Sequence, residues 1–416
     1  MDAISKNSRD IEILRELAKK YMEIATCDKN AERAQRGRLT GGLKPVRPLV
    51  WIDEIPWPEM DIDGQLTLSC EGKAERAMER FFRRTLFRWR YFQADMVVES
   101  FYAIQKSYDY SGFGISIKEN TQTSGVSEIV SHRYEDQLET FEKIDQLHTP
   151  VITARPDVDN ARLAWAEEIL SGIMPARLRG TCFYFGPWDI ISQLRGVEPI
   201  LTDMVDRPEL LHKTMDKFME IGFSQCEQME AQNLLDWDIA DLHCTPHWAD
   251  GIPTSDYSGG AVRMKDVWYR GMAQMFSSVS PGMFEEFELS HTLPLMEKFG
   301  AVYYGCCEPL DNKIHILKKI PNLRKIGVSP WANPRRAAEQ IGQSYVFSHK
   351  PNPAHVAGSF NPDVVRAEIA NVIEVCLEYK CPYEFTLKDI STVSGKPGNL
   401  IEWCRVAMDT VSRFYD

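Results

Sequence analysis

The sequence predicts an α/β protein whose main part is a closed (β/α)8 (TIM) barrel, preceded by an N-terminal helical and irregular extension. Three observations lead to this prediction. The chain has 416 residues, of which 44% are apolar, enough to bury one large core. Short β-rich runs alternate with amphipathic helical stretches, and about eight such units are what a closed parallel barrel requires. An open doubly wound sheet is the alternative that this alternation leaves open.

The first 75 residues differ in composition from the rest. A charged helical pattern runs from about Arg9 to Ala25, and a segment rich in Pro, Gly and Trp follows it. Prolines at positions 45, 48, 56 and 58 interrupt any long regular element there. We therefore predict that residues 1–75 form an extension that wraps a barrel formed by residues 76–416.

Eight β-rich runs and several helices are predicted in the barrel region. The predicted strands span residues 96–104, 149–154, 177–186, 234–243, 301–309, 323–330, 345–350 and 383–389. An arginine-rich helix begins at about Ala74, and further helices are predicted at 208–232, 280–300 and 361–380. The active site of a barrel forms at the C-terminal ends of its strands, so polar residues at those ends are the first candidates for function.

Charge and hydropathy exclude several kinds of partner. The formal net charge of −12 argues against a general affinity for nucleic acid or anionic lipid. We interpret the arginine-rich helix as an amphipathic helix whose arginines pair with the excess of acid. No apolar run reaches the roughly 18 residues that cross a bilayer, and no signal-peptide pattern opens the chain. We expect a cytoplasmic protein with no nucleic-acid or membrane partner.

Ten cysteines are scattered along the chain, too sparsely for the disulfide framework of a small secreted protein. Two of them are adjacent in the run YYGCCEPL, at the end of a predicted strand. Because side chains alternate between the faces of a strand, Tyr304, Cys306 and Glu308 share one face and Cys307 points to the other. A thiol and a carboxylate on one face can bind the same metal ion.

Histidines end two other predicted strands, at His243 and His349. Zinc accepts sulfur, nitrogen and oxygen ligands, and in catalytic sites it keeps one position open. We therefore predict a three-ligand zinc site made by Cys306, Glu308 and His349, with His243 or Cys307 as substitutes. Packing is the competing interpretation, because free cysteine is among the most buried residue types and no CxxC or HExxH spacing is present.

From about Met272 to Asp416 the sequence resembles a known family. The segment MAQMFSSVSPGMFEEFELSHTLPLMEKFGAVYYGCCEPL is similar to the C-terminal half of the uroporphyrinogen decarboxylase superfamily, in which a helix opening SPxMFxEF precedes a strand that ends in a ligand-bearing loop. The segments RPLVWIDEIPWPEM, YGCCEPL and SHKPNPA resemble a divergent subgroup grouped with corrinoid-dependent methyltransferases, which include O-demethylases. The resemblance implies a (β/α)8 barrel.

The superfamily includes two chemistries. One branch decarboxylates porphyrinogens without a metal and carries an arginine-rich motif ending in Gln-Ala-Gly-Arg, which this chain lacks. The other branch consists of zinc-dependent methyltransferases that work with corrinoid proteins, and there the corresponding strand ends in a zinc-binding His-x-Cys pair. This chain has Tyr304 in place of that histidine and Cys306 in place of the cysteine. The resemblance thus implies a rearranged metal site.

Our leading hypothesis is a methyltransferase that moves a methyl group from a small methylated substrate, such as a methoxylated aromatic, to the cob(I)alamin (cobalamin) of a separate corrinoid protein. Zinc would activate the leaving group, as a Lewis acid does for a poorly leaving oxygen. His243 and Lys350 are the predicted catalytic residues, with His243 as proton donor or fourth ligand. Tyr304, Trp331 and Trp248 are predicted to line the substrate pocket.

Two alternatives stay open at the level of the sequence. One is a metal-free decarboxylase that holds carboxylates with Lys350, Lys388 and Arg263. The other is a barrel that binds a corrinoid or tetrapyrrole without catalysis. The resemblance also implies a possible homodimer, since members of the superfamily commonly dimerise.

Overall fold

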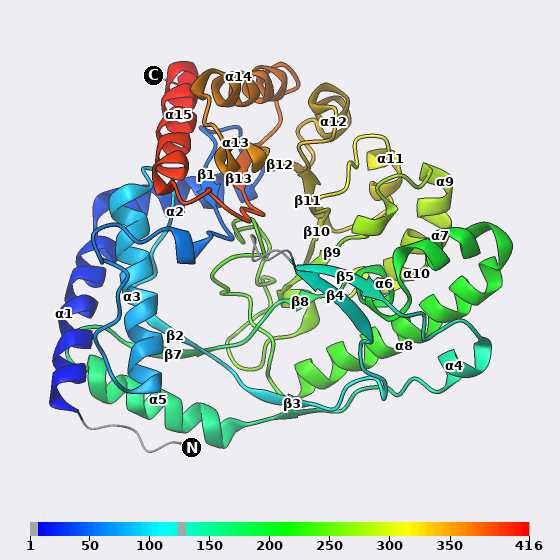
Figure 1. The fold of residues 1–416 in the computed structure, drawn as a ribbon, viewed down its shortest axis with the longest axis horizontal. Helices are drawn as coiled ribbons and strands as arrows, with labels where there is room; N and C mark the ends of the chain where they lie inside the picture. Colours follow the sequence, from blue (N-terminus) through cyan, green and yellow to red (C-terminus); the bar gives the residue numbers. More distant parts are fainter. Residues whose placement is uncertain (1–6, 124–129, 416) are drawn as a thin grey trace.

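A curled sheet of seven parallel strands organises the chain (Figure 1). The computed structural model describes residues 7–123 and 130–415. Around the sheet the strand order is β1-β13-β12-β11-β10-β9-β8. These strands are β1 (Val50–Ile52), β8 (Phe183–Tyr184), β9 (Trp268–Gly271), β10 (Ala301–Tyr304), β11 (Leu323–Val328), β12 (Val346–His349) and β13 (Tyr383–Leu387). The predicted α/β class is confirmed, as a curled half-barrel with surrounding helices that is consistent with a TIM-barrel-like fold.

Three further strand pairs lie outside the seven-stranded sheet. Strand β2 (Tyr102–Gln105) pairs in parallel with β7 (Ala176–Arg179), whereas β3 (Tyr108–Tyr110) is antiparallel to β6 (Ile152–Ala154). Strands β4 (Glu119–Thr123) and β5 (Val130–Tyr134) form an antiparallel pair. The prediction of a regular strand at 234–243 is wrong, because that segment makes only an isolated bridge, between Leu235 and Thr181.

Helices cover the convex side of the sheet, and three further helices form most of the N-terminal part of the chain. The predicted helices are confirmed as α1, α3, α8, the α9–α10 region and α14; α9 and α10 are joined by a π-helical turn (Glu285–Leu289). None of the described helices is long and apolar enough to cross a membrane. The helices are α1 (Ser8–Ala25), α2 (Asp28–Gly41), α3 (Lys73–Tyr91), α4 (Phe141–Asp145), α5 (Pro156–Leu170), α6 (Pro187–Arg195), α7 (Val197–Asp206), α8 (Pro208–Ala231), α9 (Pro281–Phe284), α10 (Ser290–Met296), α11 (Ile314–Leu317), α12 (Pro334–Ile341), α13 (Ala354–Ala357), α14 (Pro362–Glu378) and α15 (Pro397–Tyr415).

The predicted N-terminal extension contributes a strand to the sheet. Strand β1 pairs with β13, with Val50 opposite Phe385 and Ile52 opposite Leu387. This strand was not predicted, since the prolines around it suggested irregular structure. Residues 1–6 of the extension lie outside the described residues. The rest of the extension therefore supplies both the helices α1 and α2 and one edge of the sheet.

The arginines of α3 are engaged within the chain. Arg83 donates to Glu79 one turn earlier at 2.7 Å, and Arg88 donates to the carbonyl of Ile52 at 2.8 Å. The guanidinium of Arg84 lies 4.8 Å from the ring centroid of Trp57. These contacts fit the interpretation of α3 as an amphipathic helix that packs on the protein itself.

Residues 243–250, which we call the axial segment, run along the concave side of the sheet. At one end, the Nζ atom of Lys350, just after β12, donates to the carbonyl of Cys244 at 2.6 Å. At the other end, the indole N–H of Trp268, the first residue of β9, donates to the carbonyl of His247 at 2.6 Å. The segment therefore passes from the C-terminal ends of the strands to their N-terminal ends.

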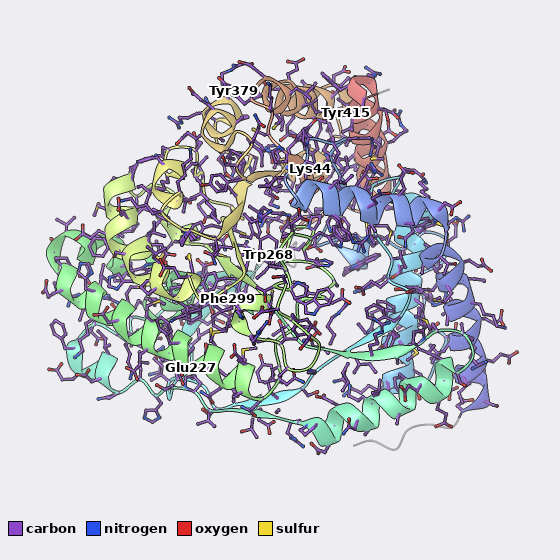
Figure 2. All side chains as sticks on the ribbon, turned by 180° about the vertical axis from the view of Figure 1, so that it is seen from behind. Lys44, Glu227, Trp268, Phe299, Tyr379 and Tyr415 are labelled. Carbon is purple, nitrogen blue, oxygen red and sulfur yellow. The ribbon has the colours of Figure 1, made fainter. Side chains whose placement is uncertain are left out.

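Helix α2 covers the C-terminal end of the axial segment, which lies at the N-terminal ends of the strands. A Cβ added at Gly37 would lie 2.1 Å from the ring of Trp248, so that indole packs directly on the helix backbone. Arg324, at the start of β11, donates to the carbonyls of Gly41 at 3.2 Å and Asp250 at 3.4 Å. Figure 2, the view from behind, shows α2 crossing this side of the molecule and the chain reaching Lys44 above Trp268.

A buried polar network, which we call the central network, joins the axial segment to the sheet. Lys325 donates to Glu384 at 2.8 Å, to the hydroxyl of Thr245 at 3.1 Å and to the carbonyl of Pro246 at 2.7 Å. Ser348 donates to the same Glu384 carboxylate at 2.7 Å. Each side chain of the network is at most 1% exposed. Polar groups replace apolar packing at the centre of the half-barrel, and they are joined to one another by hydrogen bonds that converge on Oε1 of Glu384.

Candidate metal centre

A strained turn places two potential metal ligands at the upper end of the axial segment. His243 and Cys244 both have positive φ, 45° and 64°. Residues other than glycine rarely adopt this conformation, and it persists only where surrounding contacts hold it. Here the N–H of His243 donates to Asp241 at 3.0 Å and the N–H of Cys244 donates to Asp53 at 3.0 Å. The two consecutive side chains are thereby fixed in direction.

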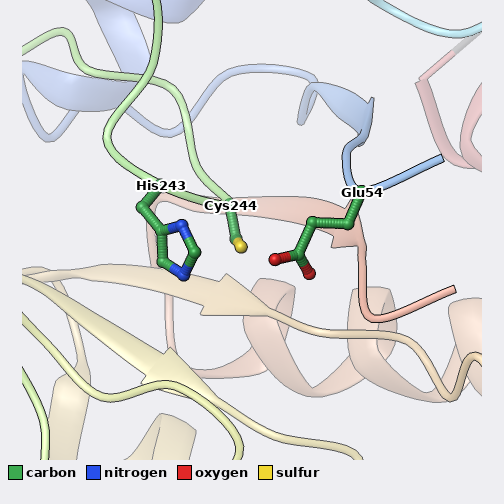
Figure 3. A group of neighbouring side chains, drawn as sticks. All are labelled: Glu54, His243 and Cys244. Atoms are coloured by element: carbon green, nitrogen blue, oxygen red, sulfur yellow. The ribbon is translucent and has the colours of Figure 1, made fainter. Parts of the chain in front are cut away.

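The same Asp53 carboxylate organises the end of β1. Its second oxygen accepts the N–H of Glu54 at 2.9 Å, so one side chain binds the backbone of both Glu54 and Cys244. One ligand atom from each of Glu54, His243 and Cys244 lies within 4.8 Å of the others. Figure 3 shows the three side chains pointing toward one another. Burial and the neighbouring carboxylate of Asp389 raise the pKa of Glu54, against the opposing charge of Lys388.

Cys306 enters the mouth of the half-barrel from the end of β10. The preceding Gly305 has φ 111°, and a Cβ there would lie 2.5 Å from Leu310 and 3.2 Å from the backbone of Gly327. Only glycine fits such a close approach of two strands. The chain then turns so that the Cys306 thiol reaches the Nζ atom of Lys388 at 3.0 Å.

Several donors and charges converge on the Cys306 sulfur. The hydrogen bond from Cys307, the one from His243 and the charges of Arg270 and Lys388 together hold the pKa of Cys306 well below its usual value. The same contact with Cys306 raises the pKa of Cys307. The contribution of His243 to this lowered pKa shows that Cys306 adjoins the group of Glu54, His243 and Cys244.

Glu308 and His349, two of the predicted zinc ligands, are not brought to this group. Both oxygens of Glu308 accept backbone N–H groups, from Cys306 at 2.9 Å and from Ala273 at 3.2 Å. Burial raises the pKa of Glu308 to about 7. His349 faces the helix layer, where its Nε2 lies 3.7 Å from Glu368 of α14. Within residues 7–123 and 130–415, the one group of three such ligands is Glu54, His243 and Cys244.

Cys307 and Lys350 support the turn and the thiols. The Cys307 thiol donates to Asp389 at 3.0 Å, and Lys388 lies between Asp389 and Cys306. Lys350 donates to the carbonyl of Cys244, and burial lowers the pKa of its amine to about 7. Of the two predicted catalytic residues, His243 therefore lies in the group, and Lys350 contacts it through the backbone.

The three predicted pocket aromatics lie in three different places. Tyr304 is fully buried on the helix side of β10, with its hydroxyl donating to Glu288 at 2.8 Å. Trp248 packs on α2, and Trp331 is 68% exposed in the loop after β11. The aromatic side chain beside the group is instead Tyr184, whose ring centroid lies 5.2 Å from that of His243 in an edge-to-face contact.

Arg263, which the decarboxylase alternative required, lies before β9, away from the strand ends that carry the thiols. It is held by Asp266 at 2.6 Å and by Asp256 at 3.1 Å. Its charge is thus already neutralised by two carboxylates.

Comparison with known proteins gives a likeness of fold. No protein-family model and no curated protein sequence matches this chain. A solved structure, a methyltransferase from Methanosarcina mazei, superposes with a TM-score of 0.50 at 12% identity and covers 92% of this chain and 99% of its own. A malate synthase from Haloferax volcanii reaches a TM-score of only 0.18 at 8% identity, over 60% of this chain and 57% of its own, and carries no argument. At 12% identity the first likeness establishes a shared fold over nearly the whole chain.

Proposed function

We propose that the protein is a methyltransferase that moves a methyl group from a small methylated substrate to the cob(I)alamin of a separate corrinoid protein, with zinc held by Glu54, His243 and Cys244 beside Cys306. The observation that carries the proposal is the convergence of a carboxylate, an imidazole and a thiol within 4.8 Å. The likeness of fold to a methyltransferase and the resemblance of the segment around YGCCEPL support it.

The donor set fits zinc better than it fits harder metal ions. Zinc binds thiolate, imidazole and carboxylate together, whereas calcium and magnesium take oxygen ligands. Three protein ligands leave a fourth position for substrate, which is the arrangement of catalytic zinc sites. A zinc ion bound here would stabilise the charge that develops on the departing heteroatom of the methyl donor.

The residues of this chain position that chemistry. Asp53 holds the backbone of Glu54 and Cys244 in one arrangement, and Lys350 fixes the carbonyl of Cys244. Hydrogen bonds of this kind orient metal ligands and are as important as the ligands themselves. Trp331, in the loop after β11, is 68% exposed and offers an apolar side chain for docking of the corrinoid protein.

The test is zinc content together with methyl transfer. Purified protein should contain about one equivalent of zinc, and Cys244→Ser and His243→Asn should each lose most of it, since removing one of three ligands greatly weakens a site. His349→Asn is the matched control and should keep the metal. Addition of methoxylated aromatics should then convert the absorption spectrum of a cob(I)alamin protein to that of its methylated form.

Two results would contradict the proposal. One is wild-type protein without zinc that also fails to methylate cob(I)alamin. The other is full zinc retention in the double variant of His243 and Cys244. A cytoplasmic location and a homodimer remain predictions from the sequence.

A further inference from the structure

Arg270, the third residue of β9, has buried hydrogen-bond donors that the protein does not use. Its side chain is 1% exposed, and its Nη1 donates to the carbonyl of Gly271 at 2.8 Å. Its Nε and Nη2 have no hydrogen-bond partner among the described residues. A buried guanidinium with two unpaired donors is costly, so its presence calls for a ligand.

The two unpaired nitrogens form one edge of the guanidinium. Nε and Nη2 carry parallel N–H bonds, which is the fork that clamps the two oxygens of a carboxylate. The chain itself shows this use: Arg195 binds Asp136 through Nε at 3.0 Å and Nη2 at 2.8 Å. Arg207 binds Asp203 in the same way, at 2.8 and 2.9 Å. Arg270 presents the same edge without a carboxylate.

Aromatic rings flank this fork. The guanidinium of Arg270 lies 4.2 Å from the ring centroid of Tyr303 and 5.8 Å from that of Tyr184. The hydroxyl of Tyr303 is also buried, with no hydrogen-bond partner in the part of the chain that the structure describes. Stacked rings and one unpaired hydroxyl form an environment that suits a flat organic acid better than a hydrated inorganic anion.

Charges of both signs surround the fork. The Nζ atom of Lys350 lies 5.4 Å from the Tyr303 ring centroid, and Lys388 lies 3.0 Å from the Cys306 sulfur and 2.8 Å from Asp389. Glu308, Asp189 and Cys306 lie within electrostatic reach of Arg270. What Arg270 still offers an entering carboxylate is therefore two unused hydrogen-bond donors on one edge.

The fork lies next to the candidate metal centre. Tyr184 contacts Arg270 on one side and His243 on the other, and the Cys306 sulfur lies within the electrostatic reach of Arg270. Tyr184 is 48% exposed, and its hydroxyl donates to the sulfur of Met272 at 3.3 Å. The fork and the candidate metal centre therefore share one partly exposed aromatic neighbour.

We infer that Arg270 binds the carboxylate of the methyl donor, and that the substrates are therefore methylated carboxylic acids with a flat body, such as methoxybenzoates. The role of this acid as methyl donor rests on the proposed function, whereas the binding of a carboxylate at Arg270 does not. Because Tyr184 lies near both Arg270 and His243, a carboxylate held by Arg270 places the rest of the acid beside the candidate metal centre.

Calorimetric titration of the protein as purified, with its zinc content measured, tests this inference with three probes. The probes are 3-methoxybenzoate, its neutral analogue methoxybenzene and inorganic phosphate. Wild-type protein should bind 3-methoxybenzoate at least about tenfold more tightly than the other two, the discrimination that a charged fork supplies. Equal binding of acid and neutral analogue, absence of acid binding, or preference for phosphate would each overturn the inference.

Variants separate a binding role from a structural one. Arg270→Met should abolish the discrimination between acid and neutral analogue, and Arg270→Lys, which keeps the charge but not the fork, should reduce it. Arg335→Met, a surface arginine paired with Glu378, is the matched control and should change nothing. Because two donors of Arg270 are unpaired, Arg270→Met should melt no lower than wild type, whereas a structural arginine would lower the melting temperature.

Zinc content and methyl transfer, measured on the same preparations, keep the two hypotheses apart. Discrimination that depends on Arg270 in a protein that carries no zinc and transfers no methyl group would support the carboxylate site and overturn the proposed function. Methyl transfer that is equally fast from neutral and acidic donors in wild type and Arg270→Met would overturn the carboxylate site and support the proposed function.

Discussion

The central network and the rim above it use the same concave face of the sheet in opposite ways. In the central network Lys325, Glu384 and Thr245 bind one another through hydrogen bonds. At the rim, Arg270 keeps two donors unpaired and His243 is held at positive φ. The difference teaches that this half-barrel is stabilised at its centre, while polar groups at the C-terminal ends of the strands are left available for ligands.

Breaking the central network should give the largest loss of stability. In Lys325→Met the Glu384 carboxylate stays buried without its cation, and removing one partner of a buried ion pair costs about 3–5 kcal/mol. Urea unfolding measures this loss. The double variant with Glu384→Leu should recover part of it, because the carboxylate is then no longer buried without Lys325, although the buried Lys350 loses the charge of Glu384. A loss below about 1 kcal/mol in the single variant would refute the contrast between centre and rim.

His247, in the axial segment, should make the free energy of unfolding depend on pH. Burial lowers the pKa of His247 to about 3 from its ordinary 6.5. Below pH 6.5 the unfolded chain therefore binds a proton that the folded chain refuses, and stability falls with pH until about 3. By about pH 5 the loss should be roughly 2 kcal/mol, at 1.4 kcal/mol per pH unit. In His247→Gln this part of the pH dependence should vanish; an unchanged slope would mean that His247 does not titrate as described.

Substitution of His349 and of His243 should have opposite effects on stability and on zinc binding, and the changes in the free energy of unfolding should be the smallest of those predicted. His349 packs between sheet and helix near Glu368, so His349→Asn should cost about 1–2 kcal/mol and leave zinc in place. His243→Asn should change stability by less than about 0.5 kcal/mol, since asparagine tolerates positive φ, yet lose the metal. Unfolding curves and zinc analysis of both variants test this prediction. Zinc loss in His349→Asn with zinc retention in His243→Asn would assign the ligand role to His349.

Much of the fold could be predicted from the sequence because its strands and helices have clear periods. Strands β10 to β13 and the long helices α8 and α14 lie where the apolar pattern places them. Strand β9 was missed because four residues, WYRG, with an arginine inside give almost no pattern. Strand β1 was hidden among prolines, and the segment 234–243 has the composition of a strand although its continuation leaves the sheet to run along its axis.

The candidate site was less predictable, because it depends on contacts between distant parts of the chain. His243 and the Cys306 thiol were anticipated from their places at strand ends. The alternation rule fails just after β10, where Gly305 turns the chain and Glu308 binds backbone instead of a metal. Glu54 and Cys244 were not predicted as ligands, although the sequence places one as an acid after a short apolar run and the other directly after His243. What joins them is Asp53, through a contact 191 positions along the chain.

The path of the axial segment also has a consequence for the order of assembly. Glu54, His243 and Cys244 are all synthesised before β9, whereas β9 to β13 follow later in the chain. The last five strands must therefore close around a segment that is already present, which requires long loops to close before their contacts form. A circular permutant opened in the glycine-containing loop at 251–260 would reverse that order, and its axial segment would have to enter a sheet that had already formed.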